Sequence, residues 1–416
     1  MAQPTERPGF SGYLIDQLAS AALRERISHL LIGDTLKAKA ARSTVLTIVN
    51  FGGQNTIRLL SNLILTRILF PEAFGLMALV QVILAGLQLF SDIGLRDSVI
   101  QDKRGGEPDF LNTAWVISII RGFLLWFATI LLAAPMAAFY DAPLLAEILP
   151  VAGFAVVLQG FSSTRILLAD RNLMIGRLTI LALGTQVLGT LVMIVLAWWL
   201  QSVWGLVIGG LVGSVASAVL SHLILPGAAN RFRLNPADAL RMFRFGRYIF
   251  LATIAGFVLA QADRAVLGKF VSLNDLAIYN IGLMLASMPM LLVQTLSMRI
   301  IFPLYARKPP SQGPDARRKI NHARRLLTGG ALSGTAFLAL LGIVLVEFLY
   351  DPRYEAAGAV VVLIALAMIP TIITYSYHRL ATAAGHSGRF ATVTISLALL
   401  QLGALNLGIQ SFGLGG

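Results

Sequence analysis

The feature that most constrains this chain is a succession of long apolar segments. A helix needs roughly 20 apolar residues to cross the hydrocarbon core of a bilayer, about 30 Å thick. The hydrophobic fraction is 56% and the charged fraction 13%, whereas a soluble domain carries roughly 25% charged residues. The sequence therefore excludes a soluble enzyme and predicts an all-α, polytopic membrane protein with about eleven spans. The predicted spans are approximately 45–69, 74–95, 113–139, 147–169, 176–199, 203–225, 246–268, 276–303, 326–350, 356–377 and 390–410.

The basic residues predict the orientation of these spans. Most of the 33 lysines and arginines lie before the first span or in the loops after even-numbered spans. The loops after odd-numbered spans hold only Arg67, Lys269 and Arg353. By the positive-inside rule, the N-terminus and the even-span loops are expected to be cytoplasmic. The net charge of +13 is thus mainly a signal of topology, and no nucleic-acid partner is expected.

The pattern of spans and loops divides the chain into four parts. Residues 1–43 form a cytoplasmic N-terminal segment with apolar residues at helical spacing. This segment is either an amphipathic helix on the membrane surface or an ordinary solvated helix. Residues 44–226 form an N-terminal lobe of six spans, 227–245 a cytoplasmic linker, and 246–416 a C-terminal lobe of five spans.

Matching landmarks recur about 200 residues apart and indicate an internal repeat. The stretch LTRILFPEAFGLM (65–77) aligns with LGKFVSLNDLAIY (267–279), which places Arg67 opposite Lys269. In the same order, Tyr140 and Asp141 align with Tyr350 and Asp351. The repeat predicts two six-helix lobes related by a pseudo-two-fold axis along the membrane normal, around a central cavity. The last helix of the second lobe is expected to be missing from this chain.

Polar residues form a stripe along the first predicted span. Asn50, Gln54, Arg58 and Asn62 are each four residues apart and share one helix face. Arg58 is about 20 Å deep at 1.5 Å rise per residue. A lipid-facing arginine at that depth costs at least roughly 2.5 to 3.5 kcal/mol, so the stripe is expected to face water, an acid or an anionic ligand. The alternative is a structural pair with a neighbouring helix.

Two other spans carry polar lines of the same kind. Gln81 and Gln88 are seven residues apart, and Asn280, Ser287 and Gln294 repeat at the same interval. Each line keeps to one helix face and is a candidate for the cavity wall. Hydrogen bonding between packed helices explains such residues equally well.

The remaining intramembrane charges are Arg121, Asp263 and Arg264. Arg121 is expected either to line the cavity or to reach partway to the cytoplasmic headgroups. Arg264 is near the outer end of its span and could reach the outer headgroups. Together with Arg58, these residues make three intramembrane arginines against one aspartate. This balance predicts a positive cavity that selects anions, and the planar guanidinium group suits phosphate oxygens. A cation exporter would need unpaired acids instead.

Catalytic and cofactor motifs are missing from the sequence. It contains no cysteine, no metal-binding histidine spacing and no GxxxxGK[ST] loop, so we expect no cofactor and no metal. A membrane-embedded glycosyltransferase or polymerase remains an alternative. It would use loop carboxylates such as Asp141, Glu147, Asp351 or Glu355. A non-transporting scaffold is a further alternative.

Several stretches resemble the polysaccharide transporter family, the Wzx-type flippases, in the superfamily that also holds MATE drug exporters and lipid II flippases. The resemblance covers roughly residues 42–416. It lies in NLILTRILFPEAFGLMALVQ (62–81), DIGLRDSVIQ (92–101), ADRAVLGKFVSLNDLAIYNIG (262–282) and FPLYAR (302–307).

The resemblance implies a transporter rather than an enzyme. Its cargo would be an undecaprenyl-pyrophosphate-linked oligosaccharide repeat unit, moved across the bacterial inner membrane by alternating access for exopolysaccharide or O-antigen synthesis. It implies contact with membrane lipids and with polysaccharide polymerase or export machinery. A drug or cation exporter of the same superfamily is the main alternative.

Overall fold

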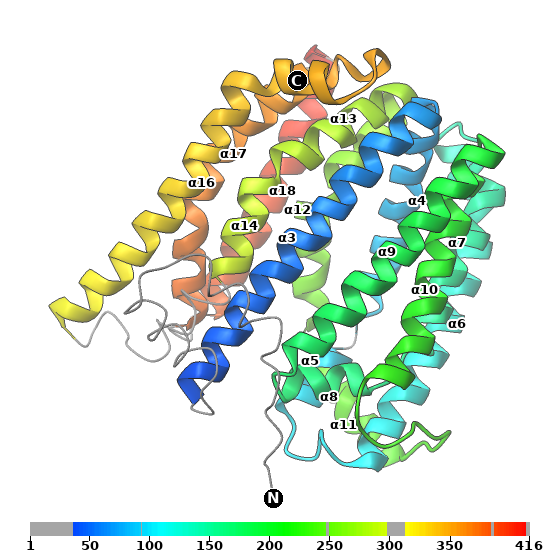
Figure 1. The fold of residues 1–416 in the computed structure, drawn as a ribbon, viewed down its shortest axis with the longest axis vertical. Coiled ribbons are helices and arrows are strands. Elements are labelled where there is room, and N and C mark those ends of the chain that lie inside the picture. The colour runs from blue at the N-terminus through cyan, green and yellow to red at the C-terminus, as the bar shows by residue number, and fades with distance from the viewer. Residues whose placement is uncertain (1–35, 93, 247–248, 298–312, 384–386, 413–416) are drawn as a thin grey trace, which may run out of the picture.

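The computed structural model describes residues 36–92, 94–246, 249–297, 313–383 and 387–412, and within these ranges the chain is helical with no strand (Figure 1). Most of the predicted N-terminal segment, residues 1–35, lies outside the described residues. The helices are α3 (Leu36–Ile68), α4 (Pro71–Phe90), α5 (Leu95–Gln101), α6 (Pro108–Phe139), α7 (Leu145–Gly160), α8 (Arg165–Arg171), α9 (Ile175–Leu200), α10 (Trp204–Ile224), α11 (Pro236–Gly246), α12 (Ile249–Phe270), α13 (Leu273–Ala286), α14 (Met288–Leu296), α16 (Pro314–Leu349), α17 (Ala357–Ala383) and α18 (Ser387–Phe412).

Each predicted apolar span corresponds to a helix or to a bent pair of helices. Within the described part of the chain, 6 helices are long and apolar enough to cross a membrane, or up to 8 if each bent pair counts as one span. The all-α, polytopic fold class is therefore confirmed. The number of about eleven spans remains a prediction.

Two predicted spans are broken rather than continuous. The span predicted at 147–169 is the pair α7 and α8, bent by 62°, and the span predicted at 276–303 contains α13 and α14, bent by 45°. Pro289 lies in the first turn of α14, and proline lacks the N–H that would continue the α13 hydrogen-bond ladder. At the other break, the Ser163 hydroxyl donates to the side-chain oxygen of Asn230 (2.8 Å). The backbone N–H of Ser163, which the interrupted helix leaves without a helical acceptor, donates to the Ser221 Oγ at 2.9 Å.

The two halves of the chain pack their helices in the same order. In the first half α3 packs on α9 and α6 on α7; in the second half α12 packs on α18 and α16 on α17. These are the helix pairs that the internal repeat makes equivalent. In the first half α9 also packs tightly on α10, where a Cβ on Gly209 would lie 2.5 Å from the Met193 Cα.

The halves meet along α4, which packs on both α12 and α13. One apolar core crosses this junction and includes Leu79 of α4, Leu276 and Ile281 of α13, and Leu145 of α7. At Gly75 the helices approach so closely that a Cβ would lie 2.0 Å from the carbonyl oxygen of Leu273. Only glycine fits there without displacing the backbone.

The predicted linker contains a short amphipathic helix, α11, which packs against α5 and α6. Its Met242 is fully buried with Val99 and Phe110. An ion pair between Asp238 and Arg104 anchors its first turn, and Arg104 also binds Glu107 at 2.8 Å. The hydrogen bond to Glu107 raises the pKa of Arg104. The linker is thus fixed to the first half of the chain.

Candidate functional site

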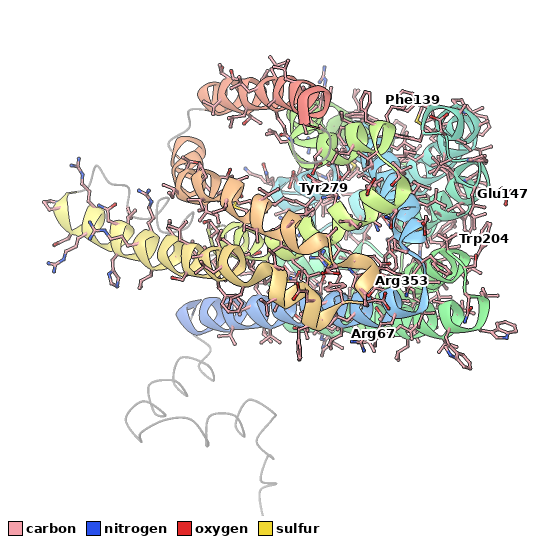
Figure 2. All side chains as sticks on the ribbon, turned by 90° about the horizontal axis from the view of Figure 1, so that it is seen from above. Arg67, Phe139, Glu147, Trp204, Tyr279 and Arg353 are labelled. Carbon is pink, nitrogen blue, oxygen red and sulfur yellow. The ribbon has the colours of Figure 1, made fainter. Side chains whose placement is uncertain are left out.

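A cavity of about 790 Å³ lies between the two halves of the molecule. Helices from both halves form its wall, and Tyr279 marks its position between them in Figure 2. Eight of the residues selected from the sequence line it: Arg58, Asn62, Gln81, Asp263, Arg264, Asn280, Ser287 and Gln294. The structure therefore brings together residues from α3, α4, α12, α13 and α14 that the sequence could only assign to separate helices.

Two arginines enter this cavity from repeat-equivalent helices. Arg58 of α3 donates its Nη2 to the Asn55 Oδ1 (2.8 Å), and Arg264 of α12 donates its Nη1 to the Gln261 Oε1 (3.1 Å). Within the described ranges neither forms an ion pair with a carboxylate, and the Arg264 Nε is buried without a hydrogen-bond partner. Both guanidinium groups line the same cavity, where like charges repel each other. Their repulsion is relieved by an anion placed between them.

Asp263 is the carboxylate of this cavity. The Tyr279 hydroxyl donates to its Oδ2 at 2.8 Å, and its Oδ1 is buried with no partner among the residues that the structure describes. Although Asp263 and Arg264 are adjacent, they form no ion pair, because neighbouring residues on a helix point about 100° apart. The charged side chains that line the described cavity are thus two arginines and one aspartate, which gives a net positive charge.

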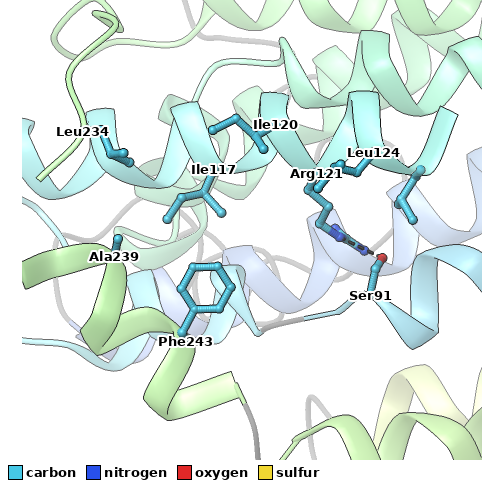
Figure 3. Close-up of a pocket in the computed structure, with 9 residues that line it drawn as sticks. Ser91, Ile117, Ile120, Arg121, Leu124, Leu234, Ala239 and Phe243 are labelled. Carbon is cyan, nitrogen blue, oxygen red and sulfur yellow. Dashed lines mark hydrogen bonds between the residues drawn. The ribbon is translucent and has the colours of Figure 1, made fainter. Parts of the chain in front are cut away.

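The remaining candidates lie elsewhere. Gln54 donates its Nε2 to the Asn50 Oδ1 (2.8 Å), and its backbone carbonyl oxygen accepts from the Gln186 Nε2 of α9 (2.9 Å); neither Gln54 nor Asn50 lines the cavity. Gln88 does not line the cavity, and its carbonyl oxygen accepts from the Arg121 Nη2 at 2.6 Å. Arg121 lines a separate groove between α6 and α11 (Figure 3).

The polar stripes in the sequence did not identify some residues of the cavity. Tyr279 and Gln186 line the wall, and Asn55 binds the Arg58 guanidinium from outside it. Tyr279 directly precedes Asn280 and so lies off the polar line of its helix. Gln186 is a single amide in an apolar span. The sequence carries no signal for either, because each gains its role from a residue on another helix.

At one end of the junction, charged side chains of the two halves touch. The Lys269 Nζ binds the Asp141 Oδ2 at 2.8 Å, and the Arg353 Nη2 donates to the carbonyl oxygen of Thr66 at 3.2 Å. The Arg353 Nε also binds the Asp351 Oδ1 at 2.8 Å. We call these residues the polar clasp; Figure 2 shows Arg353 beside α3.

The polar clasp follows the internal repeat. Lys269 matches Arg67, and Asp141 matches Asp351, so the pair Lys269 and Asp141 has a repeat-related counterpart in Arg67 and Asp351. Hydrogen bonds from Arg353, together with the charge of Arg67, hold the pKa of the Asp351 carboxyl below its usual range. Both halves of the chain thus contribute to closing this end of the junction.

The opposite end of α4 has a contact of another kind. The rings of Phe90 and Phe257 meet edge to face, with centroids 4.9 Å apart. A Cβ on Gly86 would lie 3.2 Å from the Phe257 ring, so this contact is also close. It is apolar, whereas the clasp is polar.

The geometry can be compared with known proteins. A family model described as polysaccharide biosynthesis protein matches residues 64–359. The chain belongs to this family. It is 22% identical over 273 residues to the succinoglycan biosynthesis transport protein ExoT of Rhizobium meliloti, a match that covers 65% of this chain and 55% of ExoT. It is 22% identical over 315 residues to the lipopolysaccharide biosynthesis protein WzxC of Escherichia coli, covering 74% of this chain and 61% of WzxC.

These matches span less than two thirds of the length of either relative. Among solved structures, the lipid II flippase MurJ in an inward closed conformation is similar, with a TM-score of 0.67 and 11% identity over 89% of this chain and 83% of MurJ. That likeness shows a shared fold. The resemblance predicted from the sequence is confirmed, and the chain is a multi-pass membrane protein of the polysaccharide biosynthesis family.

Proposed function

We propose that this member of the family is a flippase for lipid-linked oligosaccharide repeat units, carried on undecaprenyl pyrophosphate, in exopolysaccharide or O-antigen synthesis. The observation that supports this most is the meeting of Arg58 and Arg264, from opposite halves, in one polar cavity. A diphosphate brings two linked anionic groups into a cavity that two guanidinium groups line. Each guanidinium can form charge-assisted hydrogen bonds with phosphate oxygens.

The other cavity residues suit the sugar part of such a cargo. Asn62, Gln81, Asn280 and Gln294 offer amide donors and acceptors along the wall. The lipid chain would remain in the bilayer, while the headgroup crosses inside the protein. A diphosphate in hydrocarbon is very unfavourable, so its partial neutralisation by fixed arginines is the physical contribution of the protein.

The transport step in this proposal is alternating access at the bacterial inner membrane, with the N-terminus in the cytoplasm. In that orientation the polar clasp lies on the periplasmic side, because Arg67, Lys269 and Arg353 occupy the loops with few basic residues. Release to the periplasm requires this end to open. Polysaccharide polymerase or export machinery would take up the released unit.

The two alternatives fit the site less well. A cation exporter would need unpaired acids, whereas the acid of this cavity, Asp263, accepts from Tyr279 and shares the cavity with two arginines. Of the loop carboxylates that an embedded glycosyltransferase could use, Asp141 binds Lys269 and Asp351 binds Arg353.

The test replaces the cavity arginines in the full chain, reconstituted in vesicles with undecaprenyl pyrophosphate carrying a labelled sugar. Arg58→Ala should slow translocation by roughly 10- to 100-fold, the effect of losing a charge-assisted hydrogen bond. Arg58→Lys should retain part of the rate. Arg96→Ala is the matched control, since Arg96 is exposed and binds Asp170 within the first half. Unchanged translocation by an Arg58→Ala, Arg264→Ala double variant would refute the proposal.

A further inference from the structure

A second hollow lies apart from the central cavity, at the end of α4 far from Gly75. It is a groove of about 310 Å³ that shares no lining residue with the cavity. One wall is a single face of α6, with Ile117, Ile120 and Leu124. The facing wall belongs to α11, with Ala239 and Phe243 (Figure 3). Both walls are apolar.

Arg121 is the charged residue of this groove. It reaches from α6 toward Ser91, where its Nε donates to the Ser91 Oγ at 3.0 Å (Figure 3), and its Nη2 donates to the Gln88 carbonyl oxygen at 2.6 Å. These bonds satisfy groups at the end of α4 but use only part of the five donors of a guanidinium. Asp92 attracts Arg121 from a longer distance, and its own Oδ1 accepts from the Gly94 N–H. Within the described part of the chain, Arg121 has no ion pair.

The depth of Arg121 follows from the length of α4. This helix has 20 residues and is about 30 Å long, which equals the hydrocarbon thickness. Ser91, just beyond its last residue, therefore lies at the boundary between acyl chains and headgroups, and so does the guanidinium that binds it. Leu124 is one turn further along α6, toward the bilayer centre, and is 65% exposed.

The other side of the groove has the character of a membrane interface. α11 is strongly amphipathic and exposes Leu240 and Phe243 beside the exposed Arg241 and Arg244. Such a helix lies in the plane of the interface, with its apolar side chains among the lipids. The groove thus joins a cation at headgroup depth to apolar walls on both sides.

We propose that this groove binds one anionic phospholipid of the bilayer, with its phosphate on Arg121 and an acyl chain along Leu124. A phosphate between α6 and α11 satisfies the free guanidinium donors, and Phe243 covers the glycerol region. A net negative headgroup is preferred because Arg121 has no ion-paired carboxylate. Arg121 thus has a role in lipid binding that is separate from the cargo cavity.

The test is native mass spectrometry of the full chain in detergent with added dioleoyl phosphatidylglycerol or phosphatidylcholine. The wild-type chain should retain phosphatidylglycerol, and Arg121→Gln should weaken that retention about tenfold through loss of the charged bonds. Arg233→Gln is the control, since Arg233 is exposed next to Leu234 but binds Asp109 at 3.0 Å. It should bind phosphatidylglycerol as the wild type does.

A second variant tests the contribution of the apolar wall to lipid binding separately from that of the charge. Phe243→Ser should also weaken the retention of phosphatidylglycerol while keeping Arg121 in place. Equal retention by the wild type and both variants would overturn the proposal, as would equal retention of phosphatidylcholine. Displacement of phosphatidylglycerol from the wild type by undecaprenyl phosphate, but not from Arg121→Gln, would assign the groove to the cargo lipid and also overturn it.

Discussion

The two ends of the junction between the halves are held in different ways. At the polar clasp, an ion pair between Asp141 and Lys269 and a contact from Arg353 to the Thr66 carbonyl oxygen join the two halves. At the other end, Phe90 and Phe257 meet through their rings alone. Exposed ion pairs contribute little energy, whereas an edge-to-face ring pair is worth roughly 0.5 to 1.5 kcal/mol beyond the apolar area that it buries. The two ends therefore differ in the kind of interaction that must break before the halves can separate.

The largest expected effect comes from locking the clasp. The chain contains no cysteine, so Asp141→Cys with Lys269→Cys introduces a unique thiol pair. A short bifunctional thiol reagent should then abolish translocation in the vesicle assay, because the proposed cycle requires this end to open. The control joins Arg96→Cys to Asp170→Cys, which lie within the first half and form an ion pair in the wild type. Full activity of the locked protein would exclude opening at the clasp.

The next largest effect is on the stability of the folded protein, at the point where the two halves approach each other most closely. In Gly75→Ala the new Cβ would lie 2.0 Å from the Leu273 carbonyl oxygen, a backbone atom that cannot move alone. Overpacking of this kind costs roughly 1 to 3 kcal/mol. The apparent melting temperature in detergent should fall. Gly184→Ala is the matched control, since its Cβ would meet nothing within 4 Å; equal melting temperatures for the two variants would contradict the observed packing.

A smaller effect is expected at the ring contact. Phe257→Ala removes the edge-to-face pair with Phe90, which is worth roughly 0.5 to 1.5 kcal/mol beyond the apolar area it buries. Amide hydrogen exchange should rise in the last turn of α4 and stay unchanged in its first turn, beside the clasp. Phe127→Ala, an exposed position on α6, serves as the control. Equal changes at both ends of α4 would show that the two contacts are coupled.

The smallest effect concerns pH at the clasp. The folded protein holds the pKa of Asp351 below its ordinary value of 3.8. The stabilisation that the ionised carboxylate gives is therefore complete above pH 3.8 and is lost only as the pH falls through the lowered pKa. Wild type and Asp351→Asn should differ in apparent melting temperature by a constant amount from pH 7 to pH 5. The two should converge below about pH 3.8. A difference that disappears already near pH 6 would assign the contact to another group.

The sequence predicted the helical segments well because membrane spans depend on long apolar runs that one chain displays by itself. It also related Arg67 to Lys269 and Asp141 to Asp351. It did not predict the breaks, since Pro289 is one of several prolines in the helices, and those at Pro135 and Pro370 leave their helices continuous.

The cavity was less predictable for a geometric reason. A polar stripe shows which residues share a helix face, but not what that face meets along its length. Arg58 and Asn62 line the cavity, whereas Gln54 and Asn50, on the same stripe, do not, and the Gln54 side chain donates to Asn50 instead. Arg121 was assigned a depth from its own helix, yet its position is decided by the end of α4 that it binds.

α16 runs without interruption for 36 residues, about 54 Å, and ends next to Asp351 and Arg353 (Figure 1). This is well over the thickness of the hydrocarbon core. Its apolar stretch is long enough to cross the membrane, so its basic first turns and the clasp residues beyond its last residue would lie at different faces of the bilayer. A tilt imposed on the first turns would displace Arg353, which holds Thr66, because only three residues separate Arg353 from the end of the helix.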